Sequence, residues 1–333
     1  MCVNDTASLA DAIGNQDRRA LAQAITLVES GLKEHQSQAR ELLAALPTPA
    51  QPGLRIGITG PPGVGKSTFI ETLGGHMIQC GNSVAVLTVD PSSVISGGSI
   101  LGDKTRMPKL SVSDKAFVRP SPSSGTEGGV GRFTREAITL CEAAGFDRLI
   151  VETVGVGQSE LRVASMTDLF VLLLVPGSGD ELQGIKRGVM ELADLILVNK
   201  ADGELEQAAS RTVSEYITAT GFLQPRTHGW KVPVLGMSAL GDVGVTDALG
   251  HMETFFTHLG EGGALASRRE IQASEALMQA LHEGLLEQFL KSPGIAGEVE
   301  RARREVAKGR LTPGLAARQL IDKFAETEQS GSA

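Results

Sequence analysis

Six mostly apolar runs, each as long as a β-strand, occur between residues 55 and 238. Apolar runs without polar alternation predict strands that are covered on both faces, as in a sheet between two helical layers. Stretches with helical character separate most of the runs, and this alternation is typical of a parallel sheet. The sequence therefore predicts an α/β fold with a mostly parallel sheet flanked by helices. The runs are RIGIT (55–59), VAVLTV (84–89), RLIVETV (148–154), LFVLLLV (169–175), LILVN (195–199) and VPVLGMS (232–238), and the helical stretches include 67–79, 132–144 and 183–193.

Helix-rich segments flank this central region. Within residues 9–46, Asp17 is placed to cap a helix whose apolar positions, Leu21, Ala24, Ile25 and Val28, recur at three- and four-residue spacing. The segment PTPAQPG (47–53) cannot continue a helix, because it contains three prolines and a glycine. After Ser267 one apolar helix face is predicted by Leu277, Leu281, Leu285 and Phe289. We expect an N-terminal helical arm (1–52), a sheet domain (53–262) and a C-terminal helical extension (263–333).

Composition narrows the class of protein. The chain of 333 residues carries a formal net charge of −8, which argues against binding to a phosphate backbone, so no nucleic-acid partner is expected. A basic stretch from Arg301 to Arg310 is interleaved with Glu300 and Glu305, which favours a solvated helix face over a binding patch. Three scattered cysteines exclude a disulfide scaffold and fit a reducing cytoplasm. The start lacks the features of a signal peptide and no apolar run is long enough for a bilayer, so a cytoplasmic protein without membrane contact is expected.

A glycine-rich loop joins the first predicted strand to the first predicted helix of the sheet domain. Its residues match the pattern G-x-x-x-x-G-K-[ST], in which backbone N–H groups at a helix N-terminus cradle phosphate oxygens. We expect the lysine to reach the β- and γ-phosphates and the serine hydroxyl to ligate Mg²⁺. This predicts a P-loop sheet. The expected nucleotide-binding residues here are Gly60, Pro61, Pro62, Gly63, Val64, Gly65, Lys66, Ser67 and Thr68.

A second motif selects the base. Asn199, Lys200 and Asp202 lie at the end of the strand run LILVN and match the N-K-x-D pattern of GTP-binding proteins. A carboxylate accepts hydrogen bonds from guanine N1–H and the 2-amino group, whereas adenine would leave it unpaired. GTP and GDP are therefore the expected ligands. After the next strand run a second base-contacting element, with a backbone N–H near guanine O6, is expected at Ser238, Ala239 and Leu240.

Acidic residues at predicted strand ends and in the loop between them are candidates for the metal site. Asp90 and Glu152 end two strand runs, and Asp103 lies in a glycine-rich loop. With Ser67, these carboxylates are the expected ligands of Mg²⁺, directly or through water. The alternative is ordinary helix caps or surface acids.

A glycine-rich segment, 176–188, contains two cations. Lys186 or Arg187 could neutralise charge that develops on the γ-phosphate. Alternatively, Asp180 caps a helix whose basic residues face water. The residues themselves leave both interpretations open.

Several longer strings carry a resemblance. The chain resembles the MeaB/ArgK family of P-loop GTPases, which assist adenosylcobalamin-dependent methylmalonyl-CoA mutase and related acyl-CoA mutases. The resemblance implies Mg²⁺-dependent GTP hydrolysis, a homodimer formed by the C-terminal helices, and protection or cofactor loading of a mutase partner. It also implies that the catalytic residues are Lys66, Asp103, Glu152 and Lys186, with Asp90 and Asp103 in switch I, Glu152 in switch II and Lys186 in switch III. The strings are DPSS (90–93), GGSILGDKTRM (97–107), RPSPSSGTEGG (119–129), ETVGVGQSE (152–160), PGSGDELQGIK (176–186) and NKAD (199–202).

Two departures and two alternatives accompany this resemblance. Switch II reads Glu-Thr-Val-Gly rather than Asp-x-x-Gly, and no glutamine directly follows Gly155. Gln158 is the candidate for water activation unless it only packs or contacts the partner. A nickel-insertion-type metallochaperone GTPase would need His or Cys ligands for its cargo, but the six histidines are scattered. A transport-linked ATPase or kinase is disfavoured by Asp202.

Overall fold

The computed structural model describes residues 6–49, 51–90, 106–122, 129–153, 159–177, 187–292 and 294–331. The chain divides into two compact units, Met1–Arg269 and Glu270–Ala333, and each is described by itself. Asp103, Gln158 and Lys186 lie outside the described residues, as does the side chain of Asp90.

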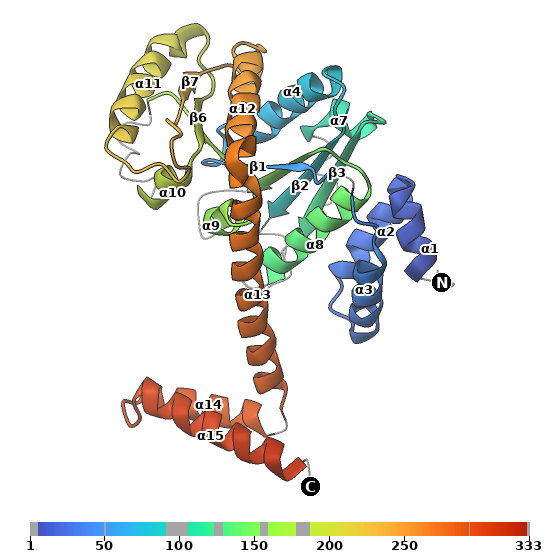
Figure 1. Ribbon diagram of the computed structural model, residues 1–333. Coiled ribbons are helices and arrows are strands. Elements are labelled where there is room, and N and C mark those ends of the chain that lie inside the picture. The colour runs from blue at the N-terminus through green and yellow to red at the C-terminus, as the bar shows by residue number, and fades with distance from the viewer. Residues whose placement is uncertain are drawn as a thin grey trace. The chain divides into compact units, whose positions relative to one another are not determined.

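The first unit is built on a seven-stranded sheet in which every pair of neighbours is parallel (Figure 1). This confirms the predicted fold class. The strand order is β3-β2-β4-β1-β5-β6-β7, so the sheet grows in opposite directions from β1. Such a switch point opens a crevice at the carboxyl ends of the strands, where open α/β sheets bind ligands. The strands are β1 (Leu54–Thr59), β2 (Val84–Asp90), β3 (Ala116–Pro122), β4 (Arg148–Thr153), β5 (Leu169–Leu174), β6 (Leu195–Val198) and β7 (Val234–Gly236).

Helices cover both faces of the sheet, and successive strand residues point to opposite sides. In β5, for example, Leu172 joins the hydrophobic cluster on one face and Val171 joins the cluster on the other. One face is covered by α4 (Lys66–Gln79), α7 (Pro108–Val112) and α12 (Val245–Gly260). The other is covered by α8 (Gly129–Ala143), α9 (Ser159–Ala164), α10 (Arg187–Leu192) and α11 (Glu206–Thr220). Both faces being apolar explains why the strand runs lack polar alternation.

The N-terminal helices pack into the same core as the sheet. They are α1 (Thr6–Gly14), α2 (Arg18–Val28) and α3 (Lys33–Ala45). Asp17 caps α2 as predicted, because its carboxylate accepts hydrogen bonds from the backbone N–H groups of residues 19 and 20 at 2.8 and 3.2 Å. The predicted apolar face of α2 is buried, and it shares one hydrophobic cluster with α8. The guanidinium of Arg18 also donates to the Ser113 carbonyl at 3.0 Å.

The edges of the sheet differ most from the sequence prediction. β3 was not among the six predicted strands, because Arg119 and Pro120 interrupt its apolar character. An edge strand tolerates both residues, since only one of its sides is paired. The last strand is also shorter than predicted, because Ser238 leaves the sheet and instead forms an antiparallel bridge with Val243.

The second unit is helical. α13 (Ala264–Lys291) begins in the first unit, and α14 (Ile295–Ala307) and α15 (Pro313–Gly331) complete the chain. The Phe289 and Phe324 rings pack edge to face with centroids 5.3 Å apart, and Lys323 pairs with Glu298 at 2.6 Å. The Thr312 hydroxyl accepts a hydrogen bond from the backbone N–H three residues later at 3.4 Å, as a helix cap. None of the described helices is both long and apolar enough to cross a membrane.

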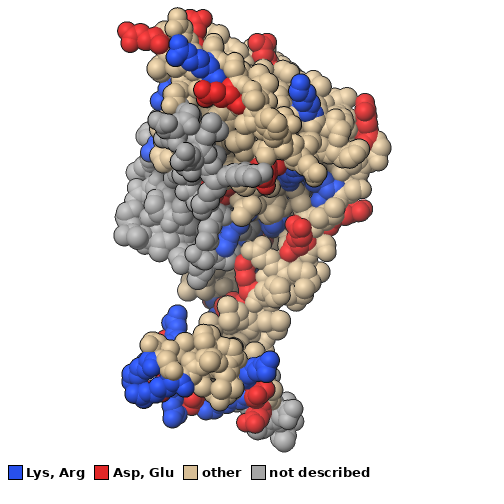
Figure 2. All heavy atoms as spheres, turned by 90° about the vertical axis from the view of Figure 1, so that its left-hand side faces the viewer, with Lys and Arg blue, Asp and Glu red and all other residues tan. Residues whose placement is uncertain are grey.

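The surface of this second unit carries two features that the sequence predicts. Apolar side chains on α13 face solvent, with Leu277 61%, Leu281 47% and Leu285 63% exposed. Basic side chains gather on the unit in Figure 2, and those between Arg301 and Arg310 are mostly exposed. Their pairs with glutamates are also solvent-exposed, as for Arg303 and Glu300 at 3.3 Å.

Candidate nucleotide site

The glycine-rich loop lies at the switch point, between the carboxyl end of β1 and the start of α4, where the sequence predicts it. Gly60 approaches β5 so closely that a Cβ atom there would lie 2.4 Å from the Leu173 carbonyl oxygen. Gly65 precedes α4 with a φ of 95°, and a Cβ on it would lie 2.6 Å from Nδ2 of Asn199. Any side chain at either position would push the loop out of place. These glycines are therefore required by close approach to the neighbouring strands.

The Lys66 side chain is fixed by hydrogen bonds to its own loop. It is buried, and Nζ donates to the carbonyl oxygens of Gly60 at 2.8 Å and Pro61 at 3.2 Å. Burial lowers the pKa of the Lys66 ammonium, although the carboxylate of Glu152 acts in the opposite direction. The loop thus fixes a cation beside the backbone N–H groups that begin α4. Cation and N–H groups together form a site for phosphate oxygens.

Glu152 and Ser67 meet beside this loop. The Ser67 hydroxyl donates to Oε1 of Glu152 at 3.3 Å, and the glutamate is buried at the end of β4. The neighbouring strand ends are tied together by a hydrogen bond of 2.8 Å between the hydroxyls of Thr59 and Thr153. A buried carboxylate beside a hydroxyl supplies the oxygen ligands that Mg²⁺ prefers. Asp90 is the last residue of β2, which pairs with β4, so its backbone lies at the same edge.

Asn199 links the phosphate loop to the loop that follows β7. Its side chain is buried at the end of β6, where Nδ2 donates to the Val64 carbonyl at 2.7 Å. Its Oδ1 accepts from the Ala239 N–H at 2.9 Å. One amide group therefore uses both of its ends to hold two loops. Lys200, the next residue, also donates to the phosphate loop, through Nζ to the Gly63 carbonyl at 2.8 Å.

Asp202 and Ser238 also lie together, as the order of the two motifs predicts. The Ser238 hydroxyl donates to Oδ2 of Asp202 at 3.0 Å, and it accepts from the Gly241 N–H at 3.0 Å. Two backbone hydrogen bonds, at 2.9 and 3.0 Å, close the same loop between Ser238 and Val243. Leu240, at its tip, is 87% exposed. The loop is thus internally fixed beside the carboxylate that the sequence assigns to the purine.

The arrangement brings together most of the expected site residues within the described chain. The residues that the sequence assigns to phosphate, metal and base binding line one edge of the sheet, from β4 through β1 to β6 and β7. Contacts from α4 to the loop Ser238–Val243 were not predicted, and Thr72 and His76 make them. Their signal in the sequence is only their spacing of four and eight residues from Thr68.

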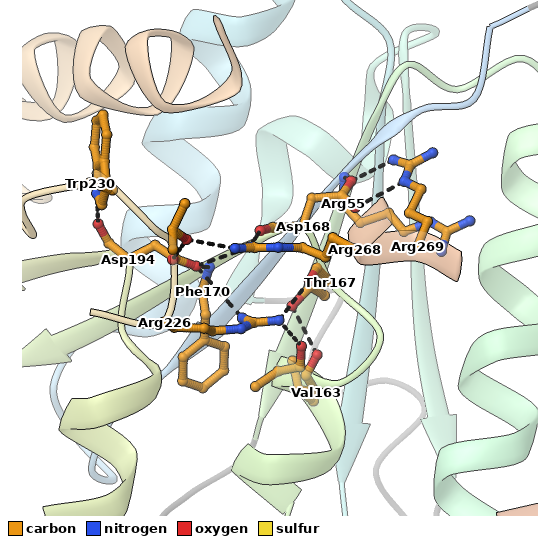
Figure 3. A network of polar contacts seen from close by, with 12 residues as sticks. Arg55, Val163, Thr167, Asp168, Phe170, Asp194, Arg226, Trp230, Arg268 and Arg269 are labelled. Carbon is orange, nitrogen blue, oxygen red and sulfur yellow. Dashed lines mark hydrogen bonds and ion pairs between the residues drawn. The ribbon is translucent and has the colours of Figure 1, made fainter. Parts of the chain in front are cut away.

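A second polar network lies at the opposite, amino-terminal edge of the sheet and was also not predicted (Figure 3). Asp168, directly before β5, accepts from the Arg55 backbone N–H at 2.9 Å and from Nε of Arg269 at 2.9 Å. Asp194, directly before β6, accepts from the Thr227 hydroxyl at 2.6 Å. Both carboxylates are buried. The only sequence signal is one acid immediately before each of two apolar runs.

Arginines complete this network. Arg226 and Arg268 each place Nη1 3.6 Å from the same oxygen of Asp194. Burial raises the pKa of the Asp194 carboxyl, although both guanidinium groups act in the opposite direction. Arg268 and Arg269 belong to the first turns of α13, so the start of that helix is fixed to the base of the sheet.

Comparisons with known proteins extend over most of the chain. The family described as "Methylmalonyl Co-A mutase-associated GTPase MeaB" matches residues 21–294. A probable GTPase of Mycobacterium tuberculosis is 48% identical over 314 residues, which cover 94% of this chain and 94% of that protein. The mouse (Mus musculus) protein named methylmalonic aciduria type A homolog, mitochondrial, is 45% identical over 317 residues, 92% of this chain and 76% of that protein. The crystal structure of a LAO/AO transport system kinase has a TM-score of 0.78 and 35% identity, and covers 98% of this chain and 100% of that one.

These matches include the phosphate loop, the Asn199–Asp202 motif and most of the sheet. The family is one of P-loop GTPases, which fits a site that combines a phosphate-loop motif with an N-K-x-D motif. The chain therefore belongs to the methylmalonyl Co-A mutase-associated GTPase family, MeaB.

Proposed function

We propose that this protein binds GTP with Mg²⁺ and hydrolyses it to GDP and phosphate, and that this cycle assists an adenosylcobalamin-dependent acyl-CoA mutase. The observation that carries the nucleotide part is the double hydrogen bond of Asn199, at 2.7 Å to the phosphate loop and 2.9 Å to the loop after β7. It holds the phosphate end and the base end of one site in a fixed relation. Asp202, fixed by Ser238, gives that site its preference for guanine.

The described residues fit the expected roles at the phosphate end. Lys66 would exchange its carbonyl partners for the β- and γ-phosphate oxygens, and the N–H groups that open α4 would hold the same oxygens. Ser67 and Glu152 fit Mg²⁺ by their oxygen chemistry and their proximity of 3.3 Å, and Asp90 and Asp103 are proposed to complete its shell. Mg²⁺, when bound, neutralises charge on the phosphates. Lys186 is proposed to stabilise charge on the γ-phosphate during hydrolysis.

Asp202 discriminates against adenine nucleotides for a physical reason. Asp202 is exposed in the nucleotide-free protein. A base that covers its carboxylate displaces water from it and must supply hydrogen bonds in return, but adenine offers an acceptor at N1. This argues against the transport-linked ATPase or kinase. The nickel-insertion alternative receives no support from the part of the chain that the structure describes, where no three His, Cys, Asp or Glu side chains form a group able to hold a metal ion.

The partner part of the proposal rests on the family. Its description names a mutase-associated GTPase, and the mouse relative is named for methylmalonic aciduria. We propose cofactor loading and protection of a mutase of the methylmalonyl-CoA type as the role of this chain. We also propose a homodimer formed by the C-terminal helices, which is supported by the exposed apolar side chains of α13, including Leu277, Leu281 and Leu285.

Nucleotide binding is tested directly by titration calorimetry of the full chain with GDP and ADP in the presence of Mg²⁺, followed by phosphate release from GTP. Tight GDP binding, weak ADP binding and slow phosphate release are expected. Equal affinity for the two nucleotides would contradict the base-reading role of Asp202. If the chain binds GTP but releases no phosphate, the proposed hydrolysis is contradicted and the proposed GTP binding is not.

The partner is tested by co-purification from the source cells with a GTP analogue, with GDP and without nucleotide. A cobalamin-dependent mutase should be retained in a nucleotide-dependent way, and its addition should accelerate phosphate release. Unchanged phosphate release with the purified mutase would count against a shared cycle. The dimer is tested separately by sedimentation, in which Leu281→Glu should shift the chain toward monomer.

A further inference from the structure

The loop that closes the base end of the site is held by α4 as well as by Asn199. This base-reading loop, Ser238–Val243, is held internally by its antiparallel bridge and by the Ser238 hydroxyl. Its position relative to the phosphates depends on what holds it from outside. Two of its external contacts come from a single face of α4.

Thr72 makes the first contact. Its hydroxyl lies 2.9 Å from the Ala239 carbonyl oxygen in the loop and 3.1 Å from the Thr68 carbonyl oxygen in the first turn of α4, so its one proton is shared between the loop and the start of the helix. Thr68 is the last residue of the phosphate-binding segment. The hydroxyl of Thr72 therefore sits directly between the phosphate end and the base end of the site.

His76 makes the second contact, one helical turn further on. Its Nε2 lies 2.7 Å from Oδ1 of Asp242 in the base-reading loop. Asp242 has a φ of 54°, a left-handed conformation that non-glycine residues adopt infrequently and aspartate more often than most. The contact with His76 thus anchors the loop at the residue where the chain turns back toward Val243.

One helix consequently sets the distance between two parts of the ligand. Residues four apart share a helix face and are separated by about 6 Å along the axis. Thr68, Thr72 and His76 form such a series, which starts at the phosphate end and ends at the base-reading loop. Hydrogen bonds weaken steeply with small displacements. A shift of this loop would therefore weaken the hydrogen bonds to the base and leave those to the phosphates unchanged.

We propose that Thr72 and His76 are positioning residues that set how strongly the base-reading loop discriminates the 6-oxo group of guanine. This inference rests on the proposed function, because it requires a guanine nucleotide in this site. The two residues do not touch the nucleotide. They act through Ala239 and Asp242, on the loop to which the sequence assigns the backbone N–H near the 6-oxo group, while Asp202 is assigned N1–H and the 2-amino group.

The test compares three diphosphates that differ only in the base. GDP carries the 6-oxo group, N1–H and the 2-amino group, and inosine diphosphate keeps the 6-oxo group and N1–H. The 2-aminopurine nucleotide keeps only the 2-amino group and, without N1–H, binds more weakly to the wild type. Calorimetry is run on the wild type, Thr72→Val, His76→Leu and the double variant. The double variant should bind GDP and inosine diphosphate about tenfold more weakly, each by the same factor, and the 2-aminopurine nucleotide with unchanged affinity.

Controls separate positioning from general damage. Thr72→Ser and His76→Gln keep a donor at each position and should restore most of the discrimination. Thr139→Val removes a hydroxyl from α8 that bonds only within its own helix among the described residues, at 3.1 Å to the Arg135 carbonyl, and should change none of the three affinities. Thermal unfolding establishes whether each variant is folded. If the double variant does not fold, the affinities of the two single variants are compared with those of the wild type instead.

The outcomes are distinct. Loss of affinity for all three diphosphates by one factor would overturn the positioning role, since it would show damage to the phosphate end. Unchanged GDP binding in both single variants would overturn it as well. A wild type that binds ADP as tightly as GDP would instead overturn the proposed function, and this inference with it.

Discussion

The two edges of the central sheet use the same kinds of side chain for different purposes. At the carboxyl edge, Lys66, Asn199 and Asp202 each bond to loops that a nucleotide would enter, and loop carbonyls supply many of the partners. At the amino edge, Asp168 and Asp194 bond to arginines, to backbone N–H groups and to a threonine within the protein itself (Figure 3). Both edges contain buried charge, but only the first has partners that a ligand can replace.

This difference shows how a buried charged group can be interpreted. A charge whose partners are other fixed side chains stabilises an arrangement, and its removal leaves the opposite charge buried. A charge whose partners are carbonyls of a glycine-rich loop can exchange them for an anion. Burial and pKa alone do not separate the two cases, because burial opposes the charged form of both Lys66 and Asp194. The identity of the partners separates them.

The largest expected effect is at the amino edge. Asp168→Ala leaves Arg269 buried without its carboxylate, and we expect the free energy of unfolding to fall by about 3–5 kcal/mol. Urea denaturation followed by circular dichroism measures this. As a control, Glu300→Ala breaks an exposed pair with Arg303 and should change stability by less than about 1 kcal/mol. Equal effects of the two variants would mean that the amino-edge network is not the stabilising one.

At the carboxyl edge, Lys66→Ala should have the opposite profile. We expect GTP affinity to fall about 100-fold, because a cation at the β- and γ-phosphates is lost, with little change in the stability of the nucleotide-free protein. Calorimetry and urea denaturation on the same sample measure the two quantities. Lys109→Ala, on the exposed surface of α7, should leave both unchanged. A large loss of stability in Lys66→Ala would erase the contrast between the edges.

Asp202→Asn should change the choice of base rather than the strength of phosphate binding. The carboxamide can donate to the 2-oxo group of xanthine, so affinity for the guanine nucleotide should fall by about 10- to 100-fold while that for the xanthine nucleotide rises. Competition binding with the two diphosphates measures the switch. A variant that keeps its preference for guanine would remove Asp202 from base recognition.

The smallest expected effect is a proton uptake that accompanies nucleotide binding. Burial lowers the pKa of Lys66 in the nucleotide-free protein, and a bound phosphate favours the charged ammonium. Binding should therefore take up protons at alkaline pH, and GDP affinity should fall as pH rises through the lowered pKa. The free energy of unfolding of the nucleotide-free protein changes with pH in the opposite direction. Because the pKa of Lys66 is lower in the folded chain than in the unfolded chain, the unfolded chain binds more protons in this range, and stability rises with pH.

Calorimetry of GDP binding in two buffers with different ionisation enthalpies measures this proton uptake. Lys66→Arg is the matched control, because a guanidinium does not titrate in that range and should bind without proton uptake. An uptake of the same size in Lys66→Arg would assign the proton to another group.

Much of the fold follows from local patterns in the sequence. The apolar runs locate six of the seven strands, namely the five inner strands and β7 at one edge, and Asp17 locates the start of α2, because burial and capping act over a few residues. β3 escapes such analysis, since a strand at the edge is held mainly by its neighbour and can contain Arg119 and Pro120. The motifs likewise predict which residues gather at the carboxyl edge of the sheet, because phosphate and base recognition demand fixed spacing.

The remaining contacts depend on distant parts of the chain. Arg269 meets Asp168 across 101 residues, and His76 meets Asp242 across 166 residues. No local spacing connects these pairs, because they depend on the order of the strands and on where α12 and α13 leave the sheet. The predicted residues Asp103, Gln158 and Lys186 lie outside the described residues, so their roles stay predictions.

The side chain of Asn199 has a practical consequence for the handling of this protein. Its amide donates at one end and accepts at the other, and hydrolysis to aspartate would set a carboxylate oxygen against the Val64 carbonyl oxygen. Two acceptors would then face each other in a buried place. Loss of ammonia from this single residue would disable a preparation that otherwise stays folded, so mass spectrometry of the peptide that contains it is a sensible measure of how well a stored sample has aged.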